Sequence, residues 1–153
     1  SRFLMAQTMG AMGYSFGAGI GAHLANANKS FVFSGDGSFW LNGLEMHTAV
    51  EYGLDVNFFV FDNAGHAMCE TRDQLYLRKS GANHVFSQSG ISIFEGIRGL
   101  FGKSNNFLCI EARTQIELHD AVCRVQSHNG PSAVVIRVKD REVPTFLPFQ
   151  CET

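Results

Sequence analysis

Two polar segments of this sequence contain the residue types that bind a metal ion and a phosphate. In the first segment, Asp36 stands between Gly35 and Gly37 and is followed by Ser38. Glycines on both sides of an acid let the backbone turn sharply and come close to a ligand. A helix that begins near Phe39 would direct its free N–H groups to the same place, where they favour an anion such as a phosphate. The carboxylate would then offer Mg²⁺ a hard oxygen ligand beside that anion.

The second polar segment supplies a partner for Asp36. Asn63 follows it by 27 positions, one helix and one strand later in the expected order of elements. In a βαβ unit the two residues therefore fall at the same edge of the sheet. The amide oxygen of Asn63 and a backbone carbonyl near Gly65 would complete the protein's share of a magnesium shell. The spacing thus predicts a metal site at the ends of two neighbouring strands.

The elements that must position these residues alternate between strand and helix. The stretches that predict strands are 30–33, 56–61, 107–111 and 133–138. The stretches that predict helices are 11–26, 39–52, 93–101 and 114–127. The connections are too long for hairpins, so we expect right-handed βαβ units in an α/β fold, a three-layer α/β/α sandwich with a mostly parallel sheet.

Some of these elements carry more specific expectations. The run VNFFVF at 56–61 is apolar enough for a strand that is covered on both faces. Gly53 stands where a C-cap glycine would end the helix 39–52, and Thr114 and Glu117 have the spacing of a capping box. The segment 63–84 is polar and irregular, and we expect a long functional loop there. The residues expected on the buried side of the helix 39–52 are Leu41, Leu44, Ala49 and Val50.

Composition and charge limit the class of protein. The 153 residues are enough for one domain with its own core, so we expect residues 1–153 to form a single domain. Hydrophobic residues make up 45% and charged residues 17%, an ordinary globular balance. The net charge of −2 gives no reason to expect nucleic acid or an anionic membrane surface as a partner. No apolar run approaches the roughly 20 residues that span a bilayer.

The cysteines indicate a reducing environment. None of the four forms a CxxC pair, which argues against a zinc site or a redox pair and fits a cytoplasmic setting. Cys109 and Cys123 lie in apolar stretches and are predicted to be buried thiols. The other two cysteines are Cys69 and Cys151.

Beyond these physical arguments, the sequence resembles a known family. One pattern is similar to the signature of thiamine-diphosphate (ThDP) enzymes. It consists of Asp36 between two glycines, a spacer of just under thirty residues and then Asn63. The segment GLEMHTAVEYGLDV at 43–56 and the glycine-rich segment at 10–14 look like the acetolactate-synthase type of that family. The resemblance is strong over 8–68 and looser beyond. It implies the C-terminal, diphosphate-binding domain of the ThDP-binding fold.

The resemblance implies a role for each matching residue. The carbonyl of Gly10 would face the exocyclic amine of the aminopyrimidine, and Met12 would hold the cofactor in its bent form. His66 would be a proton shuttle, or else a solvated loop histidine. The residues implied to bind Mg²⁺ are Asp36, Asn63 and Gly65, the last through its carbonyl. The loop implied to hold the diphosphate consists of Gly35, Asp36, Gly37 and Ser38. The residues implied to line the cofactor and substrate pocket are His66, Ala67, Met68 and Cys69.

The implied activity is decarboxylation of a small 2-keto acid, followed by protonation or carboligation of the enamine. The family's activating glutamate lies in a separate pyrimidine-binding domain, usually on a neighbouring subunit, and no such domain fits in this chain. We therefore expect a fragment or subunit of a larger enzyme that obtains this domain from elsewhere. The cofactor site is normally built between two subunits, so a dimer or tetramer is expected. FAD stays open, because the family's FAD domain would lie upstream.

Other interpretations remain. The chain could be the diphosphate-binding subunit of a two-chain sulfopyruvate- or phosphonopyruvate-type decarboxylase, or a non-catalytic assembly or regulatory remnant. A nucleotide-binding module would use the glycines of 17–21, but no apolar strand precedes them, and small residues there would let a helix pack closely on the sheet. Acetolactate synthases carry a tryptophan near the position of Arg72. An arginine there suggests a substrate with an anionic group. With Arg78 and Lys79 it forms either a solvated face or an anion clamp.

Overall fold

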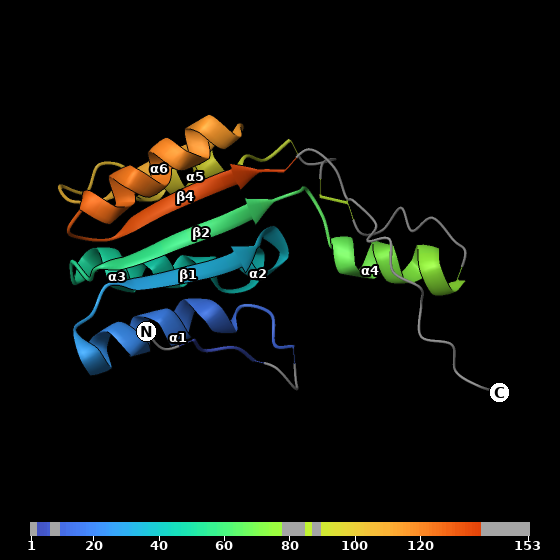
Figure 1. Cartoon of the computed structure of the whole chain (residues 1–153), viewed down its shortest axis with the longest axis horizontal. Helices are drawn as coiled ribbons and strands as arrows, with labels where there is room; N and C mark the ends of the chain where they lie inside the picture. Colours follow the sequence, from blue (N-terminus) through green and yellow to red (C-terminus); the bar gives the residue numbers. More distant parts are fainter. Residues whose placement is uncertain (1–2, 7–9, 78–84, 87–89, 139–153) are drawn as a thin grey trace.

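The computed structural model describes residues 3–6, 10–77, 85–86 and 90–138, which arrange helices around one sheet (Figure 1). The strands are β1 (Ser30–Gly35), β2 (Val56–Asp62), β3 (Leu108–Ala112) and β4 (Ser132–Arg137). The α-helices are α1 (Tyr14–Asn26), α2 (Asp36–Asn42), α3 (Met46–Glu51), α4 (Ala67–Arg72), α5 (Ile93–Phe101) and α6 (Gln115–Ser127). A 3-10 turn, η1 (Gly43–Glu45), and a π-helix, η2 (Asp73–Leu77), complete the order. The predictions for Arg78, Lys79 and Cys151 lie outside the described residues.

All four strands run parallel, in the order β1-β2-β4-β3. The arrows of β1, β2 and β4 point to one end of the molecule in Figure 1. In register, Gly35 of β1 lies opposite Phe61 of β2, and Asp62 of β2 lies opposite Arg137 of β4. The α/β prediction is confirmed, and the residues that follow β1 and β2 leave the sheet at the same edge.

Helices cover both faces of the sheet. One core joins side chains of α1, α3 and α5 to β1, β2 and β4, and a second core joins α6 to β2, β3 and β4. The central strand β2 contributes to both, because Phe58 is fully buried in the first and Phe59 is buried in the second. The strand covered on both faces, predicted from VNFFVF, is therefore confirmed.

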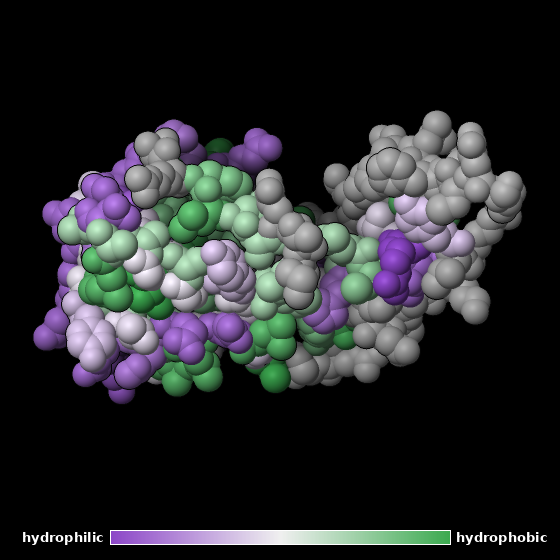
Figure 2. All heavy atoms as spheres, turned by 90° about the horizontal axis from the view of Figure 1, so that it is seen from below, coloured by the Kyte–Doolittle hydropathy of each residue, from purple (hydrophilic) through white to green (hydrophobic). Residues whose placement is uncertain are grey.

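The edge strand β1 keeps an exposed aromatic surface on the α6 side of the sheet. Phe31 and Phe33 are 47% and 58% exposed, and the Phe33 ring stacks on Phe59 with centroids 5.3 Å apart. Figure 2, which views the molecule from below Figure 1, shows apolar residues gathered in several places between hydrophilic ones.

The glycines of 17–21 lie inside helix α1. A Cβ on Gly19 would lie 2.1 Å from Cγ2 of Val32, so only glycine lets this helix approach β1 so closely. The segment is part of a packed helix rather than a turn between strand and helix. This supports the packing interpretation over a nucleotide-binding loop.

The helix predicted at 39–52 begins earlier and is interrupted. It starts at Asp36 and changes to the 3-10 turn Gly43–Glu45 before α3. A Cβ on Gly43 would lie 2.3 Å from the ring of Phe39, so glycine is needed where the two turns meet. The change of helix type rotates the second half of the helix relative to the first.

This rotation overturns part of the predicted buried side. Leu41 and Leu44 are 62% and 68% exposed, whereas Met46 and Ala49 are fully buried. The prediction was wrong for the two leucines because it assumed one continuous helix. It was right for Ala49, and Val50 is partly buried against the core.

The predicted helix ends are confirmed. Gly53 has the left-handed φ of 61°, and its N–H donates to the carbonyl of Val50 at 3.3 Å. At the start of α6, the N–H of Glu117 donates to Oγ1 of Thr114 at 3.2 Å, and Glu117 accepts from the N–H of Thr114 at 3.0 Å. This reciprocal pair is the capping box.

Two other predictions were wrong. Residues 67–77 of the expected loop form α4 and η2, because Ala67, Met68, Glu70 and Arg72 favour helix locally. Cys123 is exposed, since α6 turns Ala121 and Val125 toward the sheet instead. Cys109 packs half-buried against the first core, and burial raises the pKa of its thiol to about 11.

Within the described ranges, no helix has the length and hydropathy to cross a bilayer.

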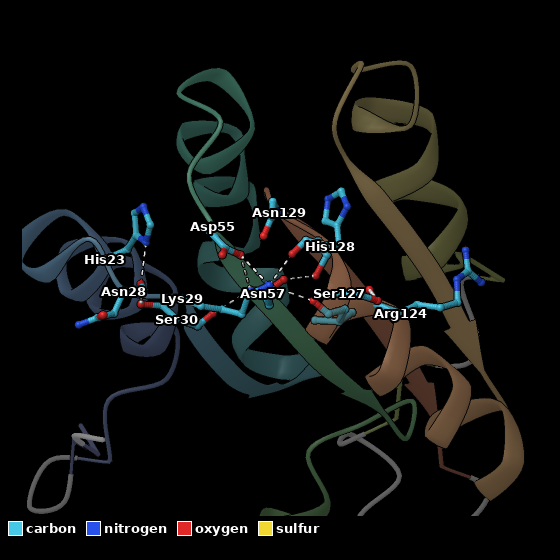
Figure 3. Close-up of polar contacts among 12 residues, drawn as sticks. His23, Asn28, Lys29, Ser30, Asp55, Asn57, Arg124, Ser127, His128 and Asn129 are labelled. Carbon is cyan, nitrogen blue, oxygen red and sulfur yellow. Dashed lines mark hydrogen bonds and ion pairs between the residues drawn. The ribbon is translucent and has the colours of Figure 1, made fainter.

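A polar cluster ties the amino-terminal ends of the strands together (Figure 3). Nζ of Lys29 donates to the carbonyls of Val125 and His128 at the end of α6, and it lies 3.3 Å from Oδ1 of Asp55. The amide of Asn57 donates to the same carboxylate at 3.0 Å. These contacts join β1, β2 and α6.

The cluster continues into the interior. Asn57 and Ser132 are both fully buried, and Oγ of Ser132 donates to Oδ1 of Asn57 at 2.7 Å. Among the described side chains, no buried nitrogen or oxygen atom lacks a hydrogen-bond partner. A fully satisfied buried network of this kind stabilises one arrangement of the strands.

We expect Lys29→Met to lower the free energy of unfolding by about 1–3 kcal/mol, because it leaves two carbonyls and a carboxylate without their cation. Urea unfolding measures this change. Arg124→Met is the matched control: Arg124 pairs with Asp120 at 3.8 Å on the exposed side of α6, so its loss should cost less than about 0.5 kcal/mol. Equal effects of the two substitutions would contradict a specific role for Lys29.

Candidate functional site

The carboxylate of Asp36 is buried at the carboxyl edge of the sheet. It is 2% exposed, and its Oδ1 and Oδ2 accept hydrogen bonds from the N–H groups of Gly37 at 2.7 Å and Gly65 at 2.9 Å. Burial raises the pKa of Asp36, and the nearby charge of Asp62 raises it further, while the backbone N–H groups of Gly65, Gly37 and Ala64 act in the opposite direction. The site is thus electrostatically suited to a cation.

A tight turn after β2 brings the second predicted segment to Asp36. Ala64 adopts the left-handed φ of 59°, and its N–H donates to Oδ1 of Asp62 at 3.2 Å. The N–H of Gly65 is shared between Asp36 and Oδ1 of Asn63, which lies 3.3 Å away. The predicted metal ligands Asp36, Asn63 and Gly65 are therefore brought together, although the first two lie 27 positions apart in sequence.

The donors that the turn offers are mostly not ionisable. Within the described ranges, no three His, Cys, Asp or Glu side chains form a group that could hold a metal ion. The predicted site instead combines one carboxylate with an amide oxygen and a carbonyl oxygen, which suits Mg²⁺ better than a transition metal. The Gly65 carbonyl also accepts from the N–H of Ala67 at 3.1 Å, which leaves it a second lone pair.

An open pocket of about 590 Å³ lies beside this turn. Met12, Gly37 and His66 line it next to one another, and the ring of His66 meets that of Phe86 edge-on with centroids 4.7 Å apart. No pattern in the sequence predicts the remaining lining residues, which are Trp40, Leu41, Val85, Phe86 and Ile91. The approach of 85–86 depends on tertiary contacts, such as the hydrogen bond from the N–H of Phe86 to the Ala64 carbonyl at 2.7 Å, which no spacing in the sequence reveals.

The other predicted residues have varied positions. Gly10 is exposed with a left-handed φ of 54°, and Gly35 is exposed at the N-cap of α2. Ser38 is half-buried in the first turn of that helix. Met68 is 88% exposed on α4, and neither it nor Ala67 nor Cys69 is among the described residues that line the pocket. Of the segment 66–69, only His66 lines it.

Two further features help to locate the site. Arg72 is largely exposed and pairs with Asp73 at 3.1 Å. A second pocket of about 370 Å³ lies at the opposite end of the sheet and is lined by residues that precede β2, β3 and β4, among them Gly53, Phe107 and Pro131. Parallel sheets bind their ligands at the carboxyl ends of the strands, so the pocket beside Asp36 is the candidate site.

The sequence matches a family model and several curated proteins. The model described as "Thiamine pyrophosphate enzyme, C-terminal TPP binding domain" matches residues 1–136. The large subunit of acetolactate synthase isozyme 1 from Escherichia coli (strain K12) is 31% identical over 144 residues, which are 92% of this chain and 24% of that protein. The acetolactate synthase large subunit of Cyanidium caldarium is 27% identical over 150 residues, 96% of this chain and 25% of that protein. The chain spans about a quarter of the length of these relatives.

The fold also has a counterpart among solved structures. Benzoylformate decarboxylase from Polynucleobacter necessarius superimposes with a TM-score of 0.73, over 90% of this chain and 25% of that one, at 20% sequence identity. This likeness confirms the predicted fold, and the sequence matches confirm the resemblance to acetolactate synthases and other ThDP enzymes.

We expect Gly37→Ala to disturb the pocket. A Cβ at this position would lie 2.7 Å from Cε1 and Nδ1 of His66 and 2.9 Å from Cε of Met12, so these side chains must move. Alanine gains up to about 1 kcal/mol over glycine in a helix, which offsets part of the packing cost. The free energy of unfolding should therefore fall by at most about 1 kcal/mol in a urea titration. Gly17→Ala in α1, where a Cβ meets nothing within 4 Å, should be neutral or stabilising by up to about 1 kcal/mol. Equal stability of the two variants would show that Gly37 is not tightly packed.

Proposed function

Because the chain belongs to the thiamine pyrophosphate enzyme family and carries its C-terminal TPP-binding domain, we propose that Mg²⁺ bound by Asp36, Asn63 and the Gly65 carbonyl anchors the cofactor's diphosphate here. The observation that carries the proposal is the 2% exposed carboxylate of Asp36 at the carboxyl edge of a parallel sheet. Beside a second buried carboxylate, Asp62, such a charge is costly until a cation compensates for it. Mg²⁺ combines a few protein oxygens with phosphate oxygens in this way.

In this proposal the residues around Asp36 bind and orient the cofactor. The first turn of α2 begins at Asp36, so the N–H of Ser38 would point toward the diphosphate, with Gly35 leaving room for its approach. The N–H of Gly37 donates to Oδ1 of Asp36, and it would be shared between this carboxylate and the diphosphate. Met12 and His66 would line the cofactor pocket and exclude water from it. The further contacts implied by the family resemblance are those of Gly10, Ala67 and Met68.

For the complete enzyme we propose decarboxylation of a small 2-keto acid, followed by protonation or carboligation of the product. When bound, ThDP supplies a carbon nucleophile for such a reaction. The proposal is supported by the acetolactate synthases that the chain matches. His66 would hold or transfer a proton at a ring nitrogen in the pocket.

The proposed enzyme needs a further domain besides residues 1–153. Its relatives are about four times longer, which supports a requirement for further domains. We propose that a pyrimidine-binding domain with the activating glutamate completes the site, either on a partner subunit or in the same polypeptide, in a dimer or tetramer. A separate subunit would correspond to the two-chain decarboxylases.

We expect Asp36→Asn to weaken Mg²⁺-dependent ThDP binding by at least about 100-fold, because the variant has no anionic ligand for the metal. Without Mg²⁺, its free energy of unfolding should stay within about 1 kcal/mol of wild type, because it loses the desolvation cost of a buried charge together with one acceptor oxygen. Titration of ThDP at fixed Mg²⁺, with urea unfolding of the metal-free protein, measures both quantities.

Asp120→Asn is the control for this experiment. Asp120 lies on the exposed side of α6, far in the fold from the carboxyl edge of β1, so its substitution should change neither quantity. Wild-type ThDP affinity in folded Asp36→Asn would contradict the metal assignment.

A further inference from the structure

Arg137 connects the candidate metal site to the neighbouring strand. It is the last residue of β4 and lies in register with Asp62, the last residue of β2. Nη1 of Arg137 donates to Oδ2 of Asp62, and its Nε lies 3.7 Å from Oε1 of Glu111 on β3. No motif in the sequence predicts a role for Arg137 or Asp62.

Both oxygens of the Asp62 carboxylate are in use. One accepts from Arg137, and the other accepts from the N–H of Ala64 at 3.2 Å. The main-chain carbonyl of Asp62 also accepts from the N–H of Val138 at 3.0 Å. The side chain is only 6% exposed, so without Arg137 it would be a buried carboxylate that lacks its cation.

The hydrogen bond to Ala64 matters because of the backbone at that residue. A left-handed φ of 59° is unfavourable for alanine and persists only when its surroundings impose it. The turn that results directs the N–H of Gly65 to Asp36 and to Asn63. A displacement of the Asp62 side chain would therefore change the positions of the predicted metal ligands in this turn.

We infer that Arg137 and Asp62 are positioning residues: Arg137 locks the Asp62 carboxylate, which holds Ala64 in its left-handed turn and so sets Asn63 and Gly65 for Mg²⁺. This inference rests on the proposed function. Mg²⁺ binding would then depend on a residue of β4, although all the predicted ligands follow β1 and β2.

Simple electrostatics predicts the opposite effect of removing Arg137. The loss of a cation near a divalent metal site, with a carboxylate left unpaired, should make Mg²⁺ binding tighter. Positioning predicts weaker binding, because the turn relaxes. The direction of the change therefore distinguishes the two explanations.

The experiment measures the Mg²⁺ concentration that gives half-maximal ThDP binding, in the protein as purified with every chain that accompanies it. Arg137→Met should raise this concentration roughly tenfold, because a turn that is no longer held in place presents the metal ligands less often in the binding geometry. Arg137→Lys keeps the charge and one donor, and it should lie between wild type and Arg137→Met. Arg113→Met removes the same charge from an exposed arginine that contacts Glu111 at the end of β3, and it should stay within about twofold of wild type.

A second substitution tests the route through Ala64. Glycine adopts a left-handed φ without strain, so Ala64→Gly should restore most of the Mg²⁺ affinity in the Arg137→Met background. Amide hydrogen exchange gives a readout that needs no cofactor: the N–H of Gly65 should exchange faster in metal-free Arg137→Met than in Arg113→Met.

The outcomes separate this inference from the proposed function. Absence of Mg²⁺-dependent ThDP binding in the wild type would contradict the proposed function and the inference with it. Binding in the wild type with an unchanged or lower Mg²⁺ requirement in Arg137→Met would overturn the inference alone. If Arg137→Met does not fold, an unchanged requirement in Arg137→Lys would overturn it equally.

Discussion

The hydrogen bond from the N–H of Gly65 to the carboxylate of Asp36 joins the two strand ends on which the site depends. It is 2.9 Å long and spans 29 residues of sequence. It forms because β1 and β2 run parallel with Gly35 opposite Phe61, so that the next residues of both strands leave the sheet together. The same bond satisfies a buried carboxylate and orients the turn that follows β2. The register of the sheet therefore determines both the geometry of this turn and the position of the groups that form the site.

The two ends of the sheet contrast in their electrostatics. At the amino-terminal end, Lys29, Asp55 and Asn57 form a cluster in which opposite charges and buried polar groups satisfy one another. At the carboxyl end, Asp36 and Asp62 are both buried, Asp62 alone has a cation beside it among the residues that the structure describes, and the pKa of Asp36 is raised. One end stabilises the fold, and the other carries an electrostatic cost that a bound cation would relieve. Such a division is typical of binding sites, where stability is given up for function.

The sequence predicted what depends on local pattern. The parallel α/β fold, the capping box at Thr114 and the placement of Asp36 and Asn63 at one edge of the sheet follow from periodicity, cap residues and the geometry of βαβ units. Features that depend on the packing of distant segments were missed. The exposure of Leu41 results from a 3-10 turn that fits a glycine against Phe39, and Arg137 meets Asp62 only because β4 lies next to β2. Single-sequence patterns contain no signal for such strand order.

We propose that this chain anchors ThDP through Mg²⁺ in an active site completed from outside residues 1–153. The most direct test is the ThDP and Mg²⁺ content of the natively purified protein, combined with an intact-mass inventory of every chain present. We expect stoichiometric ThDP and Mg²⁺, together with a second chain or a longer polypeptide that carries a pyrimidine-binding domain. Absence of ThDP, with Mg²⁺ supplied and every chain accounted for, would contradict this proposal and indicate a structural or regulatory role for the domain.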